Sequence, residues 1–301
     1  MDSKVRCAIV TGANKGIGFE ICKQLVASGI TVVLTARDEK RGLEALEKLK
    51  ESPSDKVIDV LFHRLDVADP STIPPLVDFV KAKFGKLDIL INNAAIAGGS
   101  VDWDYLKHLV IKPGWMTQAK PTDETSETYE MAEECLQVNY YGTKRMVEAF
   151  VPLLQLSDSP RIVNVSSTSG MLHNIPNKWA KQVLNDADNL TEERIDEVIN
   201  EFLKDFKEEN LESKGWPTII KAYTVSKAAM NAYTRVLAKR FPHILVNCAC
   251  PGYVKTDITS HTGLLTAEEG AESLVRLALL PNDGPSGMFF RRTEVSWFDE
   301  I

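Results

Sequence analysis

The stretch Arg6-Cys-Ala-Ile-Val-Thr11, followed directly by Gly12-Ala-Asn-Lys-Gly-Ile-Gly18, decides the fold of this 301-residue chain. Its first half is short, apolar and contains β-branched residues, which is typical of a buried strand. Beyond the glycines, apolar residues recur at helical spacing: Phe19, Ile21, Cys22, Leu25 and Val26. A strand, a glycine-rich turn and a helix in this order predict a dinucleotide site, with the pyrophosphate at the helix N-terminus.

Each glycine of this turn has a physical task in that interpretation. Gly12 permits the tight turn, while Gly16 and Gly18 allow the backbone to approach the phosphates and the helix to pack on the strand. The alternative is a structural turn without a ligand. The residues expected to bind the cofactor here are Gly12, Asn14, Lys15, Gly16, Ile17 and Gly18.

The end of the second expected strand, residues 31–36, indicates which cofactor binds. Arg37 follows this strand. A carboxylate there would hold the ribose 2′-hydroxyl of NAD, whereas an arginine suits the 2′-phosphate of NADP. Lys15 adds a second cation, so we predict NADP(H). Asp38 is either the acidic residue of an NAD site or the cap of the next helix, and Arg37 could be a solvated charge.

A tyrosine and a lysine stand four residues apart in Tyr223-Thr-Val-Ser-Lys227. On a helix this spacing places both side chains on one face. We expect the ammonium of Lys227 to lower the pKa of the Tyr223 phenol from its usual value of about 10. Such a phenol exchanges a proton with a carbonyl or alcohol oxygen near neutral pH. The alternative is an ordinary exposed helix pair.

Together these segments resemble the short-chain dehydrogenase/reductase family. The matching motifs run in the family's order from residue 5 to about residue 290. They are the turn at 11–18, Asp66-Val67 after a third strand, Asn92-Asn-Ala-Ala95 after a fourth, Asn139, Ser166-Ser167 after a fifth, Tyr223 with Lys227, and Pro251-Gly252 after a sixth. Ala95 is a departure, because the family usually has glycine there.

The resemblance implies four catalytic residues: Asn139, Ser167, Tyr223 and Lys227. Ser167 would hydrogen-bond the substrate oxygen, and Tyr223 would donate the proton. Lys227 would bind the nicotinamide ribose and lower the Tyr223 pKa, and Asn139 would hold a water that links Lys227 to solvent. Ser166 is expected to support the strand end instead.

It also implies cofactor contacts at the strand ends, where this fold binds its ligand. Asp66 and Val67 would meet the adenine, although Asp66 could instead cap a helix. The ribose would pass along Asn93 and Ala94. The residues expected to border the nicotinamide are Pro251, Gly252, Val254 and Thr256.

The segment 170–221, between Ser167 and Tyr223, is a long insertion with helical patterns. Thr191 is expected to cap one helix, and Gly215-Trp-Pro217 to stop it. In this the chain is similar to the monomeric carbonyl reductases, and within them to the plant menthone/neomenthol reductases and salutaridine reductase. The similarity implies a monomer and an insertion that covers the active site.

Composition and sequence pattern limit the domain organisation and the partners of the protein. Strand and helix patterns alternate without a linker, which predicts a single α/β domain over residues 1–301 with a Rossmann-type doubly wound parallel sheet. The net charge of −7 argues against nucleic acid or an anionic membrane as partner. We expect no metal, because the five histidines lack ligand spacing. His173 is expected either to face substrate or to lie in a surface loop.

The five cysteines, an odd number without framework spacing, indicate reduced thiols, and Cys248 with Cys250 is expected to be a buried pair on one face of a strand. No signal peptide fits the N-terminus, and no apolar run is long enough to span a bilayer. We therefore expect a cytoplasmic protein.

Aromatic and apolar residues gather in the loop 96–122 and at four later positions. They are Trp103, Tyr105, Leu106, Trp115 and Met116, with Met171, Leu172, Trp179 and Tyr253. They either line a roomy apolar pocket or anchor the loop to the core. The first case predicts a bulky apolar substrate, such as a monoterpenoid or alkaloid ketone.

The predicted function is therefore an NADPH-dependent carbonyl reductase. One alternative is reduction of an enone double bond, which some relatives perform with an acid in place of the tyrosine. The other is a non-catalytic NADP-binding protein. The presence of Ser167, Tyr223 and Lys227 favours the carbonyl reductase over both.

Overall fold

The computed structural model describes residues 6–51, 60–112 and 114–298, and its strands form one eight-stranded sheet. The strand order is β3-β2-β1-β4-β5-β6-β7-β8. The strands are β1 (Cys7–Val10), β2 (Thr31–Ala36), β3 (Val60–Arg64), β4 (Ile89–Asn92), β5 (Arg161–Val165), β6 (Leu245–Cys250), β7 (Phe289–Arg291) and β8 (Glu294–Ser296).

The pairing confirms the predicted doubly wound fold. Neighbouring strands are parallel except for β7 and β8, which pair in antiparallel register. β1 pairs with β2 on one side and with β4 on the other, so the strand order reverses at β1. In open α/β sheets, ligands bind at the carboxyl ends of the strands beside such a switch point.

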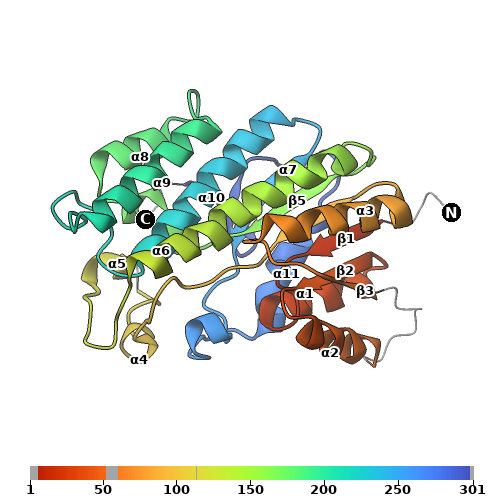
Figure 1. Ribbon diagram of the computed structural model, residues 1–301, viewed down its shortest axis with the longest axis horizontal. Helices are drawn as coiled ribbons and strands as arrows, with labels where there is room; N and C mark the ends of the chain where they lie inside the picture. The colour runs from red at the N-terminus through yellow and green to blue at the C-terminus, as the bar shows by residue number, and fades with distance from the viewer. Residues whose placement is uncertain (1–5, 52–59, 113, 299–301) are drawn as a thin grey trace.

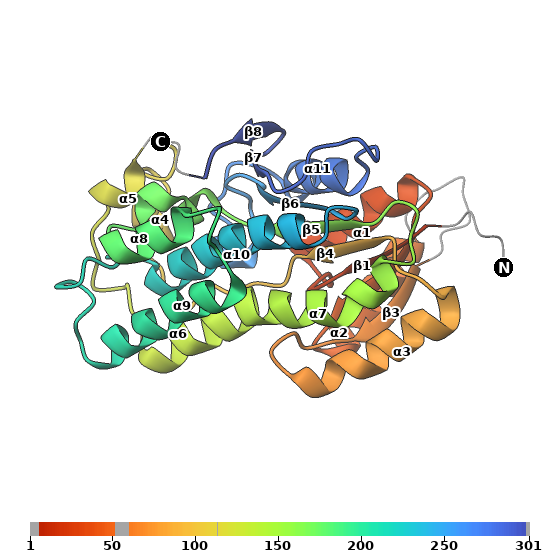
Figure 2. The ribbon, with the colours of Figure 1, turned by 90° about the horizontal axis from the view of Figure 1, so that it is seen from above.

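Helices cover both faces of this sheet (Figures 1 and 2). The α-helices of the described residues are α1 (Gly16–Ala27), α2 (Glu39–Lys50), α3 (Ile73–Phe84), α4 (Trp103–Leu106), α5 (Trp115–Gln118), α6 (Tyr129–Leu136), α7 (Gly142–Leu154), α8 (Lys178–Asn185), α9 (Glu192–Lys207), α10 (Lys221–Arg240) and α11 (Ala267–Ala278). Figure 2 shows α1 and α11 on one face, and α3, α7 and α10 on the other.

Each face of the sheet has its own apolar core. One cluster joins the sheet to α1, α2 and α11, and the other joins it to α3, α7 and α10. Because both faces are covered, every residue of β1, β2, β4, β5 and β6 is buried. Parallel strands buried on both faces read as continuous apolar runs, which explains why the sequence pattern located them.

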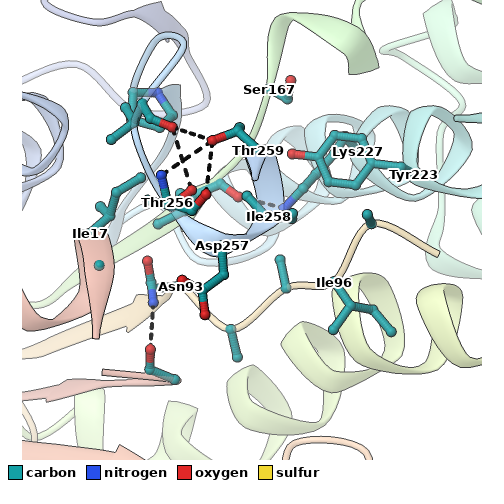
Figure 3. Close-up of a pocket in the computed structure, with 18 of the residues that line it drawn as sticks. Ile17, Asn93, Ile96, Ser167, Tyr223, Lys227, Thr256, Asp257, Ile258 and Thr259 are labelled. Carbon is teal, nitrogen blue, oxygen red and sulfur yellow. Dashed lines mark hydrogen bonds between the residues drawn. The ribbon is translucent and has the colours of Figure 1, made fainter. Parts of the chain in front are cut away.

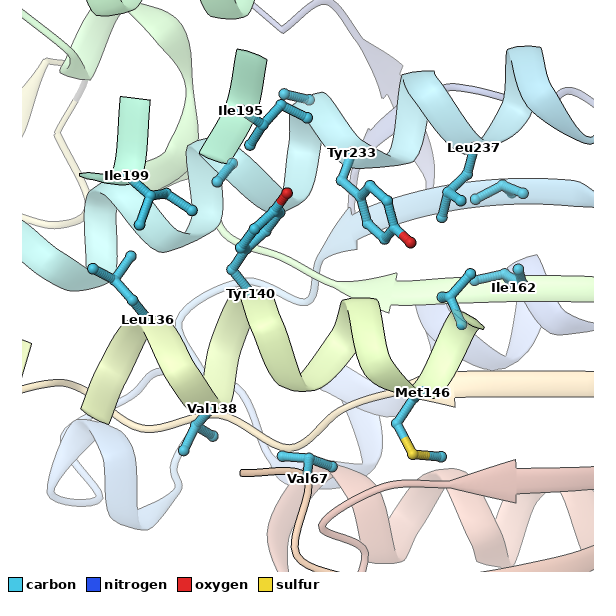
Figure 4. Packing of buried hydrophobic residues seen from close by; sticks show 14 of the residues in the cluster. Val67, Leu136, Val138, Tyr140, Met146, Ile162, Ile195, Ile199, Tyr233 and Leu237 are labelled. Atoms are coloured by element: carbon cyan, nitrogen blue, oxygen red, sulfur yellow. The ribbon is translucent and has the colours of Figure 1, made fainter. Parts of the chain in front are cut away.

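The insertion 170–221 contributes α8 and α9, which pack on the side of the molecule formed by α6 and α10. Ile195 and Ile199 of α9 point toward Leu136 of α6 and toward α10 (Figure 4). Thr191 caps α9 as predicted, because its side chain accepts a hydrogen bond from the Arg194 N–H at 3.3 Å. A monomer remains a prediction from this insertion.

The predicted helix stop at Gly215 is wrong. α9 already ends at Lys207, and Glu209 then takes a left-handed backbone with φ 57°. Trp216 is instead an anchor: it is 2% exposed, and its Nε1 donates to Asp205 Oδ2 at 2.7 Å. An indole that buries its ring and satisfies its N–H holds the end of the insertion against α9.

All five cysteines are free and buried. Cys248 and Cys250 pack with Met171 and Phe289, which confirms the predicted buried pair. Within the described ranges, no group of three or more His, Cys, Asp or Glu side chains is placed to hold a metal ion. Nor does any helix of these ranges combine the length and apolarity that crossing a membrane requires.

Candidate active site

A cavity of about 1000 Å³ lies at the carboxyl ends of the central strands. Its lining contains all the residues predicted to bind the cofactor, and it contains Ser167, Tyr223 and Lys227. One large concave site that gathers polar groups from distant segments is the usual form of an enzyme active site.

The glycine turn forms one end of the cavity. Gly12 and Gly16 have left-handed backbones, with φ values of 61° and 55°. A Cβ at Gly18 would lie 2.5 Å from Asn93 Nδ2, so no larger residue fits there. The N-cap residue of α1, Lys15, makes no capping hydrogen bond with its side chain, and the first turn of α1 contains no acidic residue. The free N–H groups of this turn therefore suit a pyrophosphate.

Thr11 and Asn93 hold this turn in place, and Figure 3 shows the Asn93 side chain at the edge of the cavity. The Asn93 Nδ2 donates to the carbonyl oxygens of Thr11 at 2.9 Å and Gly12 at 3.1 Å. The Thr11 hydroxyl accepts from the backbone N–H groups of Asn93 and Ala94 at 2.9 and 3.0 Å. The Asn93 amide thus organises the turn, whereas the sequence predicted only a ribose contact. Sequence reasoning missed this role of Thr11, whose only signal is its place at the strand end.

Arg37 is exposed and lines the cavity just beyond β2. Asp38 caps α2 by accepting from the Arg41 N–H at 3.0 Å, so the capping interpretation of Asp38 is confirmed. Lys15, the second cation that the sequence predicted here, also lines the cavity, where it pairs with Asp257. Asp257 also lies 3.1 Å from His261 Nε2. The sequence carried no signal for this long-range pair.

Asp66 and Val67, which are expected to meet the adenine, both line the cavity. One Asp66 oxygen accepts from the Ala68 N–H at 3.0 Å and stabilises the turn after β3. The following short helix is capped by Asp69, so the alternative in which Asp66 caps that helix is wrong.

Helix α10 brings Tyr223 and Lys227 to one face, as their spacing predicted. The Lys227 Nζ lies 5.5 Å from the centre of the Tyr223 ring and donates to the Val165 carbonyl at 2.8 Å. Ser167 lies just beyond the same end of β5 (Figure 3). Ser166 supports the strand end as expected, since its hydroxyl donates to Asn231 Oδ1 at 2.5 Å.

Burial controls the ionisation of this pair. It raises the pKa of the Tyr223 phenol well above its ordinary value, and a hydrogen bond with Ser167 only partly opposes this. The predicted lowering of the Tyr223 pKa is therefore wrong for this structure. Burial lowers the pKa of Lys227 to about 8, because a low-dielectric site disfavours its charge. The phenol is consequently protonated at neutral pH, as a proton donor must be.

Asn139 lies in a π-helical turn, Gln137–Tyr141, between α6 and α7. Its side chain is fully buried and does not line the described cavity. Its Oδ1 accepts from the Ile96 N–H at 2.9 Å, and its Nδ2 donates to the Ile96 carbonyl and to the Ser226 hydroxyl, both at 3.0 Å. Asn139 therefore ties the loop after β4 to α10, and its water-holding role remains a prediction.

The other end of the cavity is apolar. It is lined by Ile96, Val101, Trp103, Val110, Trp115, Ile220 and Tyr253. The rings of Trp103 and Tyr253 lie 5.8 Å apart, so they join the loop 96–122 to the loop after β6.

The remaining apolar residues that the sequence grouped here do not line the cavity. Tyr105, Leu106 and Met116 pack in a small separate core with Ile219 and Ile220, which precede α10. Leu172 is buried in the core on the α10 face of the sheet, Met171 is buried against Cys248 and Cys250, and Trp179 is 40% exposed. Some of the aromatic residues therefore line the cavity, and others anchor the loop by packing in a core. His173 and the insertion residues 171–219 also lie outside the lining, so a lid role for the insertion remains a prediction.

Comparison with known proteins places this geometry in a family. A sequence model of the family described as short chain dehydrogenase matches residues 6–178. The chain belongs to the short-chain dehydrogenase/reductase family. It is therefore an oxidoreductase that acts on CH–OH or carbonyl groups, in a family that uses a nicotinamide cofactor. A second model, described as Enoyl-(Acyl carrier protein) reductase, matches residues 211–284.

Relatives of this short-chain dehydrogenase/reductase span nearly its whole length. A (+)-neomenthol dehydrogenase of Arabidopsis thaliana is 58% identical over 294 residues, which cover 97% of this chain and 98% of the relative. A (-)-isopiperitenone reductase of Mentha piperita is 50% identical, with 95% and 96% covered. The solved structure of salutaridine reductase from Papaver somniferum is 55% identical with a TM-score of 0.85, covering 95% of this chain and 99% of that one.

Proposed function

We propose that this protein is an NADPH-dependent carbonyl reductase acting on a bulky apolar ketone of the monoterpenoid or alkaloid class. The observation that carries the proposal is the continuity of one cavity. It runs from Arg37 and the glycine turn, past Tyr223, to the apolar wall around Trp103 and Tyr253. The names of the neomenthol dehydrogenase and the salutaridine reductase support the same substrate class.

The chain's own residues fit the binding and proton steps of such a reaction. NADPH, when bound, supplies the hydride. Tyr223 then donates its phenolic proton to the ketone oxygen, and the Ser167 hydroxyl hydrogen-bonds that oxygen as negative charge develops. Lys227 holds the ribose, and the apolar wall excludes water from the reacting carbonyl.

The test is NADPH consumption with a panel of ketones and enones, menthone and isopiperitenone among them, with each product identified. Alcohol products would support the carbonyl reductase. Saturated ketones formed from enones would replace it with the double-bond reductase, which the isopiperitenone reductase among the relatives favours. Tight NADPH binding without any turnover would favour a non-catalytic NADP-binding protein.

Replacing Arg37 by Ala is expected to reduce the preference for NADPH over NADH. The exposed guanidinium lies at the end of β2, where a 2′-phosphate is expected, whereas the Lys15 ammonium is paired with Asp257. Loss of a charge-assisted hydrogen bond of about 1.5–3 kcal/mol corresponds to a roughly ten- to hundred-fold loss in kcat/KM for NADPH. The measurement is the ratio of kcat/KM for NADPH and NADH, with Arg41→Ala on the same helix start as the control. An unchanged ratio would contradict the NADP preference.

A further inference from the structure

The first turn of α10, which carries Tyr223, has no cap from its own segment. Its N-cap residue, Ile220, has no side-chain acceptor and takes a left-handed backbone, with φ 40° and ψ 46°. A β-branched residue adopts this conformation only where the surroundings impose it. Ile220 is also 6% exposed and lines the cavity. The backbone enters the catalytic helix through a constrained residue that forms part of the site's wall.

Glu127, from a distant segment, supplies the missing acceptors. Its Oε2 accepts from the Lys221 N–H at 3.1 Å, and its Oε1 accepts from the Ala222 N–H at 2.7 Å. The carboxylate is 5% exposed, and the Lys221 ammonium lies 3.6 Å from it. A carboxylate at a helix N-terminus is favoured by the helix dipole and by the free N–H groups there. Tyr223 is the next residue of the helix.

Glu127 also stands at the base of the loop that forms the apolar wall. Its neighbour Ser126 pairs with Ser100 in a two-way backbone bridge of 2.8 and 3.2 Å. The bridge closes the loop that contains the cavity residues Trp103 and Trp115. A Cβ at Gly99 would lie 2.4 Å from the Ser126 carbonyl, so the two loop ends are in close contact. The loop base and the helix start therefore share one buried carboxylate.

We propose that Glu127 is a positioning residue that couples the apolar loop, which holds the ketone, to the first turn of α10, which carries Tyr223. It would set the distance between the ketone oxygen and the phenol. This inference rests on the proposed function. The effect is large in principle, because misplacing a reacting group by about 1 Å lowers a rate by roughly a hundred-fold.

The kinetic test compares Glu127→Gln with Lys221→Met in the full-length protein. Glu127→Gln keeps the size of the side chain but replaces one acceptor by an NH₂ group that faces a backbone N–H. We expect kcat for a ketone of the panel to fall about ten- to a hundred-fold. The dissociation constant for NADPH should stay within about two-fold, because the cofactor residues are not touched. Lys221→Met removes the ammonium that faces the Glu127 carboxylate and the Phe206 ring but leaves both backbone N–H groups in place, so kcat should fall less than in Glu127→Gln.

Amide hydrogen exchange supplies a measurement that needs no substrate. Glu127→Gln should speed exchange both in residues 97–126 and in the first turn of α10, while β1 and β4 stay protected. Faster exchange in α10 alone, with unchanged kcat, would reduce Glu127 to a helix cap and overturn the coupling. Wild-type kinetics and exchange in the variant would overturn it as well.

Two further cases must be distinguished: a Glu127→Gln variant that does not fold, and a wild-type protein that reduces no ketone. If Glu127→Gln does not fold, Glu127→Asp replaces it. The shorter carboxylate retains the charge but cannot reach both N–H groups, so a lower kcat with intact NADPH binding is expected, and a wild-type kcat would overturn the proposal. If the wild-type protein reduces no ketone, the proposed function fails, and the exchange experiment still decides whether the loop and α10 are coupled.

Discussion

Replacing Tyr223 by Phe is expected to lower kcat for ketone reduction by about 10²- to 10⁴-fold. The substitution removes only the phenolic oxygen, which is protonated at neutral pH because burial raises the pKa of Tyr223. The ring stays in place beside the Lys227 ammonium. NADPH affinity should therefore change by no more than about three-fold. Single-turnover oxidation of bound NADPH measures the chemical step directly.

The matched control for this substitution is Tyr253→Phe. Tyr253 also lines the cavity, and its hydroxyl hydrogen-bonds the Thr262 hydroxyl in the same loop. Loss of that hydrogen bond should change kcat only a few-fold, because it acts on a wall of the site. A Tyr223→Phe variant that keeps more than about a tenth of wild-type kcat would remove Tyr223 from the role of proton donor.

Replacing Lys227 by Met is expected to weaken NADPH binding about ten- to a hundred-fold and to lower kcat by at least a similar factor. Lys227 is 1% exposed, and its ammonium donates to the Val165 carbonyl at the end of β5. In the proposed reaction it also binds the ribose, so its loss affects both affinity and orientation. Fluorescence titration with NADPH and steady-state kinetics separate the two effects. Wild-type affinity in the variant would contradict the ribose role.

The same substitution should stabilise the protein near neutral pH. The pKa of Lys227 is about 8 in the folded chain, against about 10.4 for an exposed lysine. Below pH 8 the lysine is charged in both states, so the folded state bears the full cost of burying the charge. As pH rises from about 8 to about 10, the unfolded state binds more protons than the folded state, and the cost disappears.

Thermal unfolding across this pH range measures the effect. The melting temperature of Lys227→Met should exceed that of the wild type at pH 7, and the difference should shrink as pH rises toward 10. The Lys239→Met variant, at the far end of α10, is the control for a lysine outside the site. A Lys227→Met protein that melts below the wild type at pH 7 would show that the bond to Val165 outweighs the buried charge.

Local sequence signals predicted the parts of the site that lie within one segment. The strand–turn–helix at 6–27 is one example, because a buried parallel strand and an amphipathic helix each impose a period on the chain. The helical spacing of Tyr223 and Lys227 is another, and the two side chains do share a face. Asp38 and Thr191 cap α2 and α9, since capping needs only residues a few positions apart.

Contacts between distant segments were not predictable in this way. Lys15 and Asp257 are 242 positions apart in the sequence, so no local pattern predicts that they pair. The Tyr223 pKa depends on how deeply the assembled cavity buries the phenol, and burial outweighs the hydrogen bond with Ser167. The role of Asn139 was not predictable either, because its side chain hydrogen-bonds Ile96 and Ser226, which lie far from it in the sequence.

The sequence by itself determined the order of strands and helices, the glycine turn and the residue types of the site, because these depend on periodicity, chain entropy and side-chain chemistry. Only the tertiary structure decided which aromatic residues line the cavity, that Lys15 is paired and that Glu127 caps the helix of Tyr223. Those outcomes depend on desolvation and on distances between segments far apart in the chain, and both quantities exist only once the chain has folded.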